Sequence, residues 1–309
     1  MVLPAPLGPI TTQRSDSSTS QEMLLIKVEP LRTMLTPASS TTAAMGSTYS
    51  SALALLGLAS ERTEAIQRRD TRVMESLPSV RMTANLNSMI RGEQSIEQAE
   101  RAIVGDDVAH HVIDPEAALG LDPLQASTLD EALEALLAAE RDGWFLALPV
   151  PGSLAPLRGP APFNIAAVEQ GQAVVASSAG LGLVPIRVGH AVQWRIFPAE
   201  RPLPPSSPYD AERALNEVVI DAAATLSRLD VGSGVRPALP APAVLAPGYS
   251  PHQRATAERA SQLLAACDAA LLHDGASISS FEADRRAQEL RRVRTKAGEA
   301  LGSAVSWLR

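Results

Sequence analysis

The sequence predicts an α+β protein: a small sheet of three to four strands with flanking helices, followed by a three-helix C-terminal half packed on it. Two patterns predict this class. Short apolar runs of strand length occupy the middle of the chain, and helical stripes with cap residues occupy its C-terminal part. In addition, aromatic residues make up only 3% of the chain, so the core must consist of small aliphatic side chains, which suits closely packed helices.

The first segment, residues 1–80, is rich in Ser, Thr and Pro and has almost no apolar periodicity. Such a composition buries too little apolar area to offset the entropy of ordering, so we predict a disordered N-terminal extension. A marginal helix over residues 51–69 is the exception. An over-extended gene, with its true start at Met74, Met82 or Met89, would also explain this texture. Deletion of residues 1–80 should then leave the melting temperature unchanged.

Residues 85–200 are predicted to form a small α/β unit. A short helix is expected over 95–102 and a longer one over 129–141, where Thr128 and Glu131 have capping-box spacing. The apolar run 144–150 has strand length and predicts a strand covered on both faces. The other predicted elements are a helix at 163–170, a strand at 173–177, and a hairpin of strands 183–188 and 191–197.

Residues 206–309 are predicted to form the helical half. Ser-Pro pairs at 207–208 and 250–251 each have a cap residue followed by proline, the arrangement that starts a helix. A third helix is expected to begin at Ser279 or Ser280, with Glu282 completing a capping box. Residues 230–249, rich in Pro, Ala and Gly, predict an extended strap between the first two helices.

Composition narrows the possible partners. The net charge of −7 and the pI near 5.3 give a field that repels phosphate backbones and anionic membranes. Cys267 is the only cysteine, so neither an intrachain disulfide nor a thiolate zinc site can form. The apolar run 52–59 is far shorter than the ~20 residues that cross a bilayer. We therefore expect a cytoplasmic protein without membrane association or cofactor.

One candidate ligand loop follows the strand predicted at 173–177. Small and hydroxyl-bearing residues after a strand can hold a phosphate or expose a nucleophile. The sequence contains neither G-x-S-x-G nor a complete G-x-G-x-x-G here, so a loop or bulge between strands is the favoured interpretation. The candidate ligand-binding residues are Ser177, Ser178, Gly180, Gly182 and Arg187.

A second candidate is the segment containing Asp106, Asp107, His110 and His111. In a helix, each Asp would lie one turn from a His, and a carboxylate with an imidazole can hold zinc or iron. A closed site needs three or four protein ligands, and no partner motif supplies the rest. We favour a solvated polar segment and predict no metal site.

The last predicted helix carries a basic face, which could contact phosphates or an acidic partner. Counted with Arg309, the segment has seven positive and four negative residues, a balance of +3. Acidic residues near the helix start and basic ones later also suit the helix dipole and a solvated surface. The candidate contact residues are Arg285, Arg286, Arg291, Arg292, Arg294 and Lys296.

The few bulky rings and the single thiol are predicted to be core residues. Because bulky rings are scarce in this chain and each buries a large area, we expect each of them to anchor the core. A cysteine on an apolar helical stripe packs as a small hydrophobic residue. The residues concerned are Trp144, Phe145, Phe163, Trp194, Phe197, Cys267 and Trp307.

No complete catalytic motif stands in the sequence. The leading hypothesis is therefore a non-enzymatic cytoplasmic interaction or regulatory module with a protein partner, in an oligomeric state that the sequence leaves open. A second hypothesis is a small-molecule-binding protein or enzyme with its site near residues 177–187, which requires those groups to converge on a concave pocket. A third is weak nucleic-acid contact through the basic last helix.

Overall fold

The computed structural model describes residues 77–229, 245–272 and 279–306, all within one compact unit, Leu55–Arg309. The predicted disorder of residues 1–76 and the marginal helix at 51–69 lie outside the described residues. So does the predicted strap over residues 230–244.

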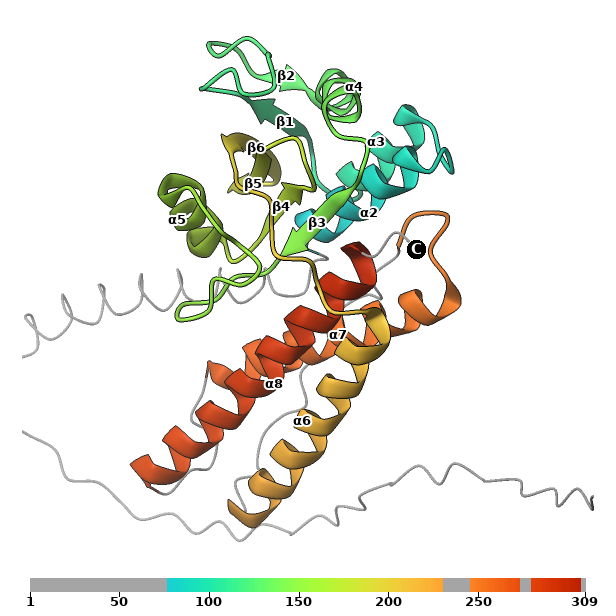
Figure 1. Ribbon diagram of the computed structural model, residues 1–309. Coiled ribbons are helices and arrows are strands. Elements are labelled where there is room, and N and C mark those ends of the chain that lie inside the picture. Colours follow the sequence, from blue (N-terminus) through green and yellow to red (C-terminus); the bar gives the residue numbers. More distant parts are fainter. Residues whose placement is uncertain (1–76, 230–244, 273–278, 307–309) are drawn as a thin grey trace, which may run out of the picture. The chain divides into compact units, whose positions relative to one another are not determined.

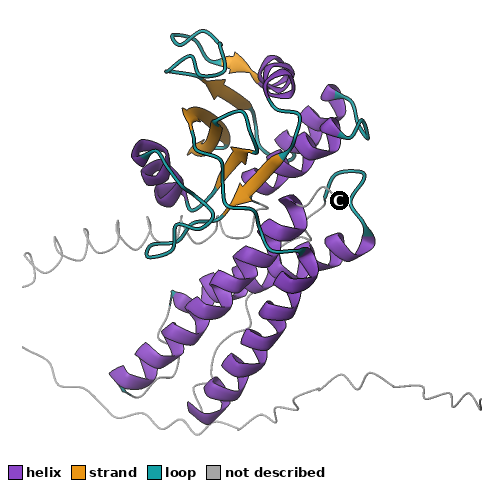
Figure 2. Cartoon of the chain, in the orientation of Figure 1, coloured by secondary structure: helices purple, strands orange, loops and turns teal. Residues whose placement is uncertain are grey.

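The structure is α+β, as predicted, but its mixed sheet has six strands, so the prediction of three to four was wrong. The strand order is β2-β1-β6-β5-β4-β3, and every neighbouring pair is antiparallel except β1 with β6. Figure 2 shows the strands in orange and the helices in purple. The sequence missed the two strands that extend the sheet at one edge because they are short and mostly polar. The strands are β1 His110–Ile113, β2 Ser127–Thr128, β3 Trp144–Ala147, β4 Ala173–Ala176, β5 Leu181–Val188 and β6 Ala191–Pro198.

Helices cover both faces of the sheet. On one face lie α2 (Pro78–Ile90), α3 (Ile96–Val104) and α4 (Leu129–Ala139), which share a core with Val174 of β4. On the other lies α5 (Ala161–Gln170), which packs against a core that includes the next residue of that strand, Val175 (Figure 1). The alternation of side chains along β4 therefore explains why all four of its residues are buried.

Helix α2 shows that the fold begins earlier than predicted. Pro78 opens the helix, and Ser79 and Val80 are buried, although the sequence placed all three in the disordered extension. The helix is buried on all sides, and polar residues on it bond to other elements: the Ser79 hydroxyl donates to the Gln172 side chain at 2.7 Å. Because a helix buried all round has no polar face, it lacks the amphipathic stripe that sequence analysis detects.

The helical half contains α6 (Pro208–Leu229), α7 (Pro251–Leu271) and α8 (Ser280–Ser306). Helix α8 packs against both α6 and α7, and it also contacts β3 and α2 (Figure 1). The predicted starts of α7 and α8 are confirmed, because both are capped by reciprocal hydrogen bonds, Ser250 with Gln253 and Ser279 with Glu282. No helix among the described residues has the length and apolarity that a bilayer crossing requires.

The two halves share a core. Leu146 of β3, Leu215 of α6 and Leu301 of α8 are all buried in the same apolar cluster. The end of the predicted strap also belongs to this cluster, because Tyr249 is buried there and its hydroxyl donates to the Val305 carbonyl at 2.6 Å. The sheet and the helices are thus joined by apolar packing and by directional bonds.

Candidate functional site

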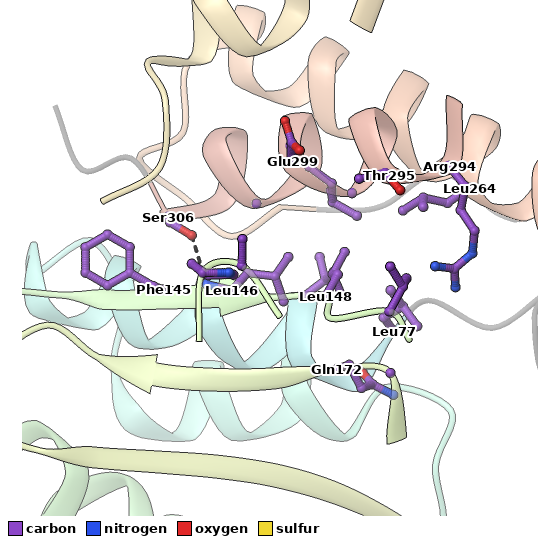
Figure 3. Close-up of a pocket in the computed structure, with 18 of the residues that line it drawn as sticks. Leu77, Phe145, Leu146, Leu148, Gln172, Leu264, Arg294, Thr295, Glu299 and Ser306 are labelled. Atoms are coloured by element: carbon purple, nitrogen blue, oxygen red, sulfur yellow. Dashed lines mark hydrogen bonds between the residues drawn. The ribbon is translucent and has the colours of Figure 1, made fainter. Parts of the chain in front are cut away.

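A cavity of about 770 Å³ lies where the sheet meets the helical half. One wall is formed by β3 and the start of α2, and the opposite wall by α7 and α8 (Figure 3). Cavities of ~300–1,000 Å³ hold small molecules in proteins, and they occur preferentially between domains. This cavity is therefore the candidate functional site of the described structure.

The sheet-side wall presents a group of leucines and is tied to α8 by a hydrogen bond. Leu146 and Leu148 line it from β3 and the residues just after it, and Leu77 lines it from the residue before α2 (Figure 3). The Leu146 N–H donates to the Ser306 hydroxyl of α8 at 2.8 Å, so the edge strand is fastened to the opposite wall at the cavity's end.

The helical wall adds Leu264 of α7 and a mixed set of α8 side chains. Arg294 is paired with Asp268, and Glu299 accepts from Lys296 at 2.6 Å. Since these charges already have partners on the same helical wall, they are compensated before any ligand arrives.

Arg187, at the far end of β5, also lines the cavity and is tied to a buried cluster behind the sheet. Its guanidinium donates to Asp107 at 2.9 Å, and Arg81 of α2 binds the same carboxylate. Burial raises the pKa of Asp107, but the hydrogen bond to His110 and the two guanidinium groups outweigh burial, and the net pKa lies below its usual value. Asp107 is therefore a carboxylate in the folded protein.

His110 completes this cluster. Its side chain is fully buried, with Nε2 at 3.0 Å from the Asp107 carboxylate and Nδ1 accepting from the Trp194 indole at 3.1 Å. The segment containing it is an extended turn and strand and not the helix considered for metal binding. Among the described residues, no three His, Cys, Asp or Glu side chains come together in a way that could hold a metal ion.

The candidate loop before β5 is closed by a residue that the sequence analysis did not single out, Glu140. Its buried carboxylate accepts from the backbone N–H of Ser178 at 2.6 Å, of Ala179 at 2.9 Å and of Asp142 at 2.6 Å. The Ser178 hydroxyl donates to the same carboxylate at 3.1 Å. The Ser178 hydroxyl is therefore already hydrogen-bonded within the protein and helps to fix the conformation of this loop.

The structure does not bring the five candidate ligand residues together. Ser177, Ser178 and Gly180 lie between β4 and β5, and Gly182 near the start of β5, whereas Arg187 lies near its end. Gly182 is required for packing, since a Cβ there would lie 2.5 Å from the Phe163 ring. Of the five, only Arg187 lines the cavity.

The basic residues of α8 are engaged in local contacts. Arg285 and Arg292 flank the buried Glu289, at 3.1 Å and 2.7 Å. The Arg286 guanidinium donates to the Ala270 carbonyl at 2.9 Å. Arg294 and Lys296 have the acidic partners described above, and Arg291 borders a smaller hollow beside α6. This face is thus largely compensated by its own neighbours.

The prediction of buried aromatic residues is confirmed for four rings, while Trp307 lies outside the described residues. Phe145, in contrast, is only half-buried and lines the cavity. The four buried rings are Trp144, Phe163, Trp194 and Phe197.

Two family models match successive parts of the chain, and the boundary between them separates the sheet-side residues of the cavity from the helical ones. Residues 79–210 match the Rv1486c-like protein, N-terminal domain, and residues 209–302 match the Rv1486c-like protein, C-terminal domain. Together the two matches span residues 79–302, so this part of the chain is similar to both domains of the Rv1486c-like protein. No curated protein and no solved structure matched the chain significantly.

The two Rv1486c-like domains meet at the first turn of α6, because their matches overlap at residues 209–210. Apart from Leu77 and Pro78, the sheet-side wall of the cavity lies in the region that matches the N-terminal domain, and Leu264 and Arg294 lie in the region that matches the C-terminal domain. The candidate site is therefore assembled from residues of both matched regions.

Sequence reasoning missed this site because no motif marks it. Its walls combine apolar and polar residues from strands, loops and helices that are distant in the sequence. The only signal available was the pair Gly298 and Gly302 on the last helix, whose missing side chains let α8 approach Leu146 and Leu148 closely.

Proposed function

We propose that this protein is a binding protein that holds a small, mainly apolar molecule in the cavity between its two domains. The observation that carries the proposal is the cavity itself: it has the volume of a small-molecule site and apolar side chains on both walls.

The polar lining favours an uncharged ligand. Most of the charged residues that line the cavity, among them Arg187, Arg294 and Glu299, have an oppositely charged partner within the protein. Apolar contacts with leucines therefore supply most of the affinity, and polar groups fix the orientation. This site differs from the one predicted near residues 177–187, because Arg187 is the only one of the five candidate residues that lines the cavity.

The test uses an uncharged apolar fluorophore, N-phenyl-1-naphthylamine, as the probe. Ser261→Trp on α7 and Thr295→Trp on α8 each place an indole into the cavity from a partly exposed position. Ile165→Trp on α5, where Ile165 is 58% exposed and outside the lining, is the matched control.

We expect saturable binding with one probe per chain and affinity at least about tenfold weaker in both cavity variants, a loss of about 1.4 kcal/mol. The control should bind as the original protein does, and all variants should melt alike without probe. Absence of saturable binding, or equal binding by all variants, would contradict the proposal.

A protein partner is the second candidate function, and one feature of α6 favours it. This helix of 22 residues buries only three of them, and Tyr209 and Ile220 are 69% and 68% exposed. The two residues lie on one face, three helical turns apart, with the Arg213–Glu217 ion pair between them. Aromatic and aliphatic residues exposed on one helix face are typical of protein interfaces.

Cross-linking with mass spectrometry in cell extract can test this second candidate. The double variant Tyr209→Ser with Ile220→Lys should lose a cross-linked protein that the original chain captures through α6, while it still binds the fluorophore. Retention of that cross-link by the double variant would exclude α6 as the interface.

A further inference from the structure

The protonation state of His110 is fixed by its two neighbours. An indole nitrogen only donates a hydrogen bond, so Trp194 at 3.1 Å requires that Nδ1 carry no proton. A carboxylate only accepts, so Asp107 at 3.0 Å requires a proton on Nε2. The geometry therefore selects one neutral tautomer of a side chain that is fully buried.

The charged residues described around the His110 ring also disfavour the binding of a second proton to it. Arg81 from α2 and Arg187 from β5 converge on Asp107, which gives two positive charges and one negative charge beside the imidazole. A proton added at Nδ1 would face the Trp194 N–H and add a third positive charge. Burial lowers the pKa of His110, and the charges of Arg81 and Arg187 lower it further. The contact with Asp107 raises the pKa, but the net pKa remains below 6.5.

The position of His110 in the sheet gives its protonation a structural consequence. It is the first residue of β1, which joins β6 in parallel register and is otherwise bordered only by the two-residue β2. Trp194 lies on β6 opposite Val112 of β1. The bond from Trp194 to His110 is thus a side-chain link between two neighbouring strands near the β2 edge of the sheet.

We propose that His110 is an acid-sensitive latch, which ties β1 to β6 while the imidazole is neutral and releases this edge of the sheet when it is protonated. Release breaks the Trp194 hydrogen bond at Nδ1 and leaves the Asp107 contact at Nε2 in place. The loosening is therefore expected in β1 and β2 and not in the central strands.

The first test is ¹⁵N NMR of the imidazole in the intact protein. At pH 7 we expect the neutral ring with its proton on Nε2, and a titration midpoint below that of an ordinary histidine, about 6.5. Trp194→Phe removes the indole donor, so the midpoint should move upward. A charged ring at pH 7, or a proton on Nδ1, would overturn the proposal.

The second test measures hydrogen-exchange protection factors, which are corrected for the intrinsic effect of pH. Between pH 7 and pH 5 we expect protection at residues 110–113 to fall at least about tenfold, with residues 174–176 of β4 as the internal control. His110→Gln stays neutral and should abolish this difference. An equal acid response in His110→Gln, or no response in the original protein, would overturn the latch.

Discussion

Asn87 of α2 pairs with Trp144 of β3 as a neighbouring strand would. The Asn87 side-chain oxygen accepts from the Trp144 N–H at 2.8 Å, and the side-chain nitrogen donates to the Trp144 carbonyl at 2.9 Å. The same nitrogen donates to the Val305 carbonyl of α8 at 3.2 Å. One buried amide therefore satisfies both backbone groups of Trp144 at the outer edge of β3 and links this strand to α2 and α8.

Removal of this amide should be severely destabilising. Asn87→Ala leaves the N–H and carbonyl of Trp144 buried without partners, at about 1–3 kcal/mol for each group. We expect a loss of roughly 3 kcal/mol or more in the free energy of unfolding, measured by urea denaturation. Thr295→Ala, which removes a hydroxyl that bonds only to its own helix at Arg291, is the control and should change stability little. A similar small effect for Asn87→Ala would contradict this role.

Glu140 should make stability depend on acidic pH. Burial raises the pKa of Glu140, but hydrogen bonds from Ser178, Ala179 and Asp142 outweigh burial and hold the pKa below its usual 4.5. A carboxyl group with a lowered folded-state pKa stabilises the protein above its unfolded-state value and loses this contribution as pH falls below it.

Glu140→Gln should therefore cost about 1–3 kcal/mol at pH 7, and the difference from the original protein should shrink as the pH falls below 4.5. Urea denaturation at several pH values measures both effects. Glu134→Gln, at an exposed position on α4, is the matched control and should show neither. A pH-independent difference for Glu140→Gln would refute the role of the charge.

The sequence predicted those elements whose signals are local. The hairpin around residues 189–190 was found because two apolar runs flank a two-residue turn, and α7 because a cap residue precedes a proline. Helix α2 escaped because its polar residues, such as Asn87, are buried and bonded to distant elements. Only the folded structure reveals such partners.

The candidate site was less predictable than the fold. Serines and glycines before β5 resembled a ligand loop, yet the carboxylate of Glu140, which comes from 38 residues earlier in the chain, occupies their donors. The apolar part of the cavity, in contrast, is formed by leucines whose sequence pattern indicates only burial. Its existence depends on how closely α8 approaches β3, which no local pattern encodes.

Two glycines of α8 allow a direct test of that approach. A Cβ at Gly298 would meet Leu148 at 3.8 Å, an ordinary contact, whereas a Cβ at Gly302 would lie 3.3 Å from the Leu146 carbonyl oxygen. That strand cannot easily yield, because the Leu146 N–H is bonded to Ser306 of the same helix.

Gly298→Ala should therefore stabilise the protein by about 0.5–1 kcal/mol, the usual gain in a helix interior. In Gly302→Ala, crowding between the new Cβ and the Leu146 carbonyl oxygen should cancel this gain. We therefore expect Gly302→Ala to be less stable than Gly298→Ala by about 1 kcal/mol or more. Thermal unfolding of the two variants provides the comparison. Equal stabilisation by both substitutions would show that α8 and β3 are not tightly packed at this point.

Cys267 should be unreactive in the folded protein. The thiol is buried on α7 in an apolar cluster with Ala222 and Val293, as the sequence predicted. Burial, reinforced by the neighbouring Asp268 charge, raises the pKa of Cys267 to about 12, so almost no thiolate exists at pH 8. Ellman's reagent should label the native protein very slowly and label one thiol per chain at once in 8 M urea. The reagent reacts with the thiolate and must reach the buried sulfur, so the labelling rate of the native protein reports how often the packing of α6, α7 and α8 opens. Rapid labelling without urea would show that this packing is loose.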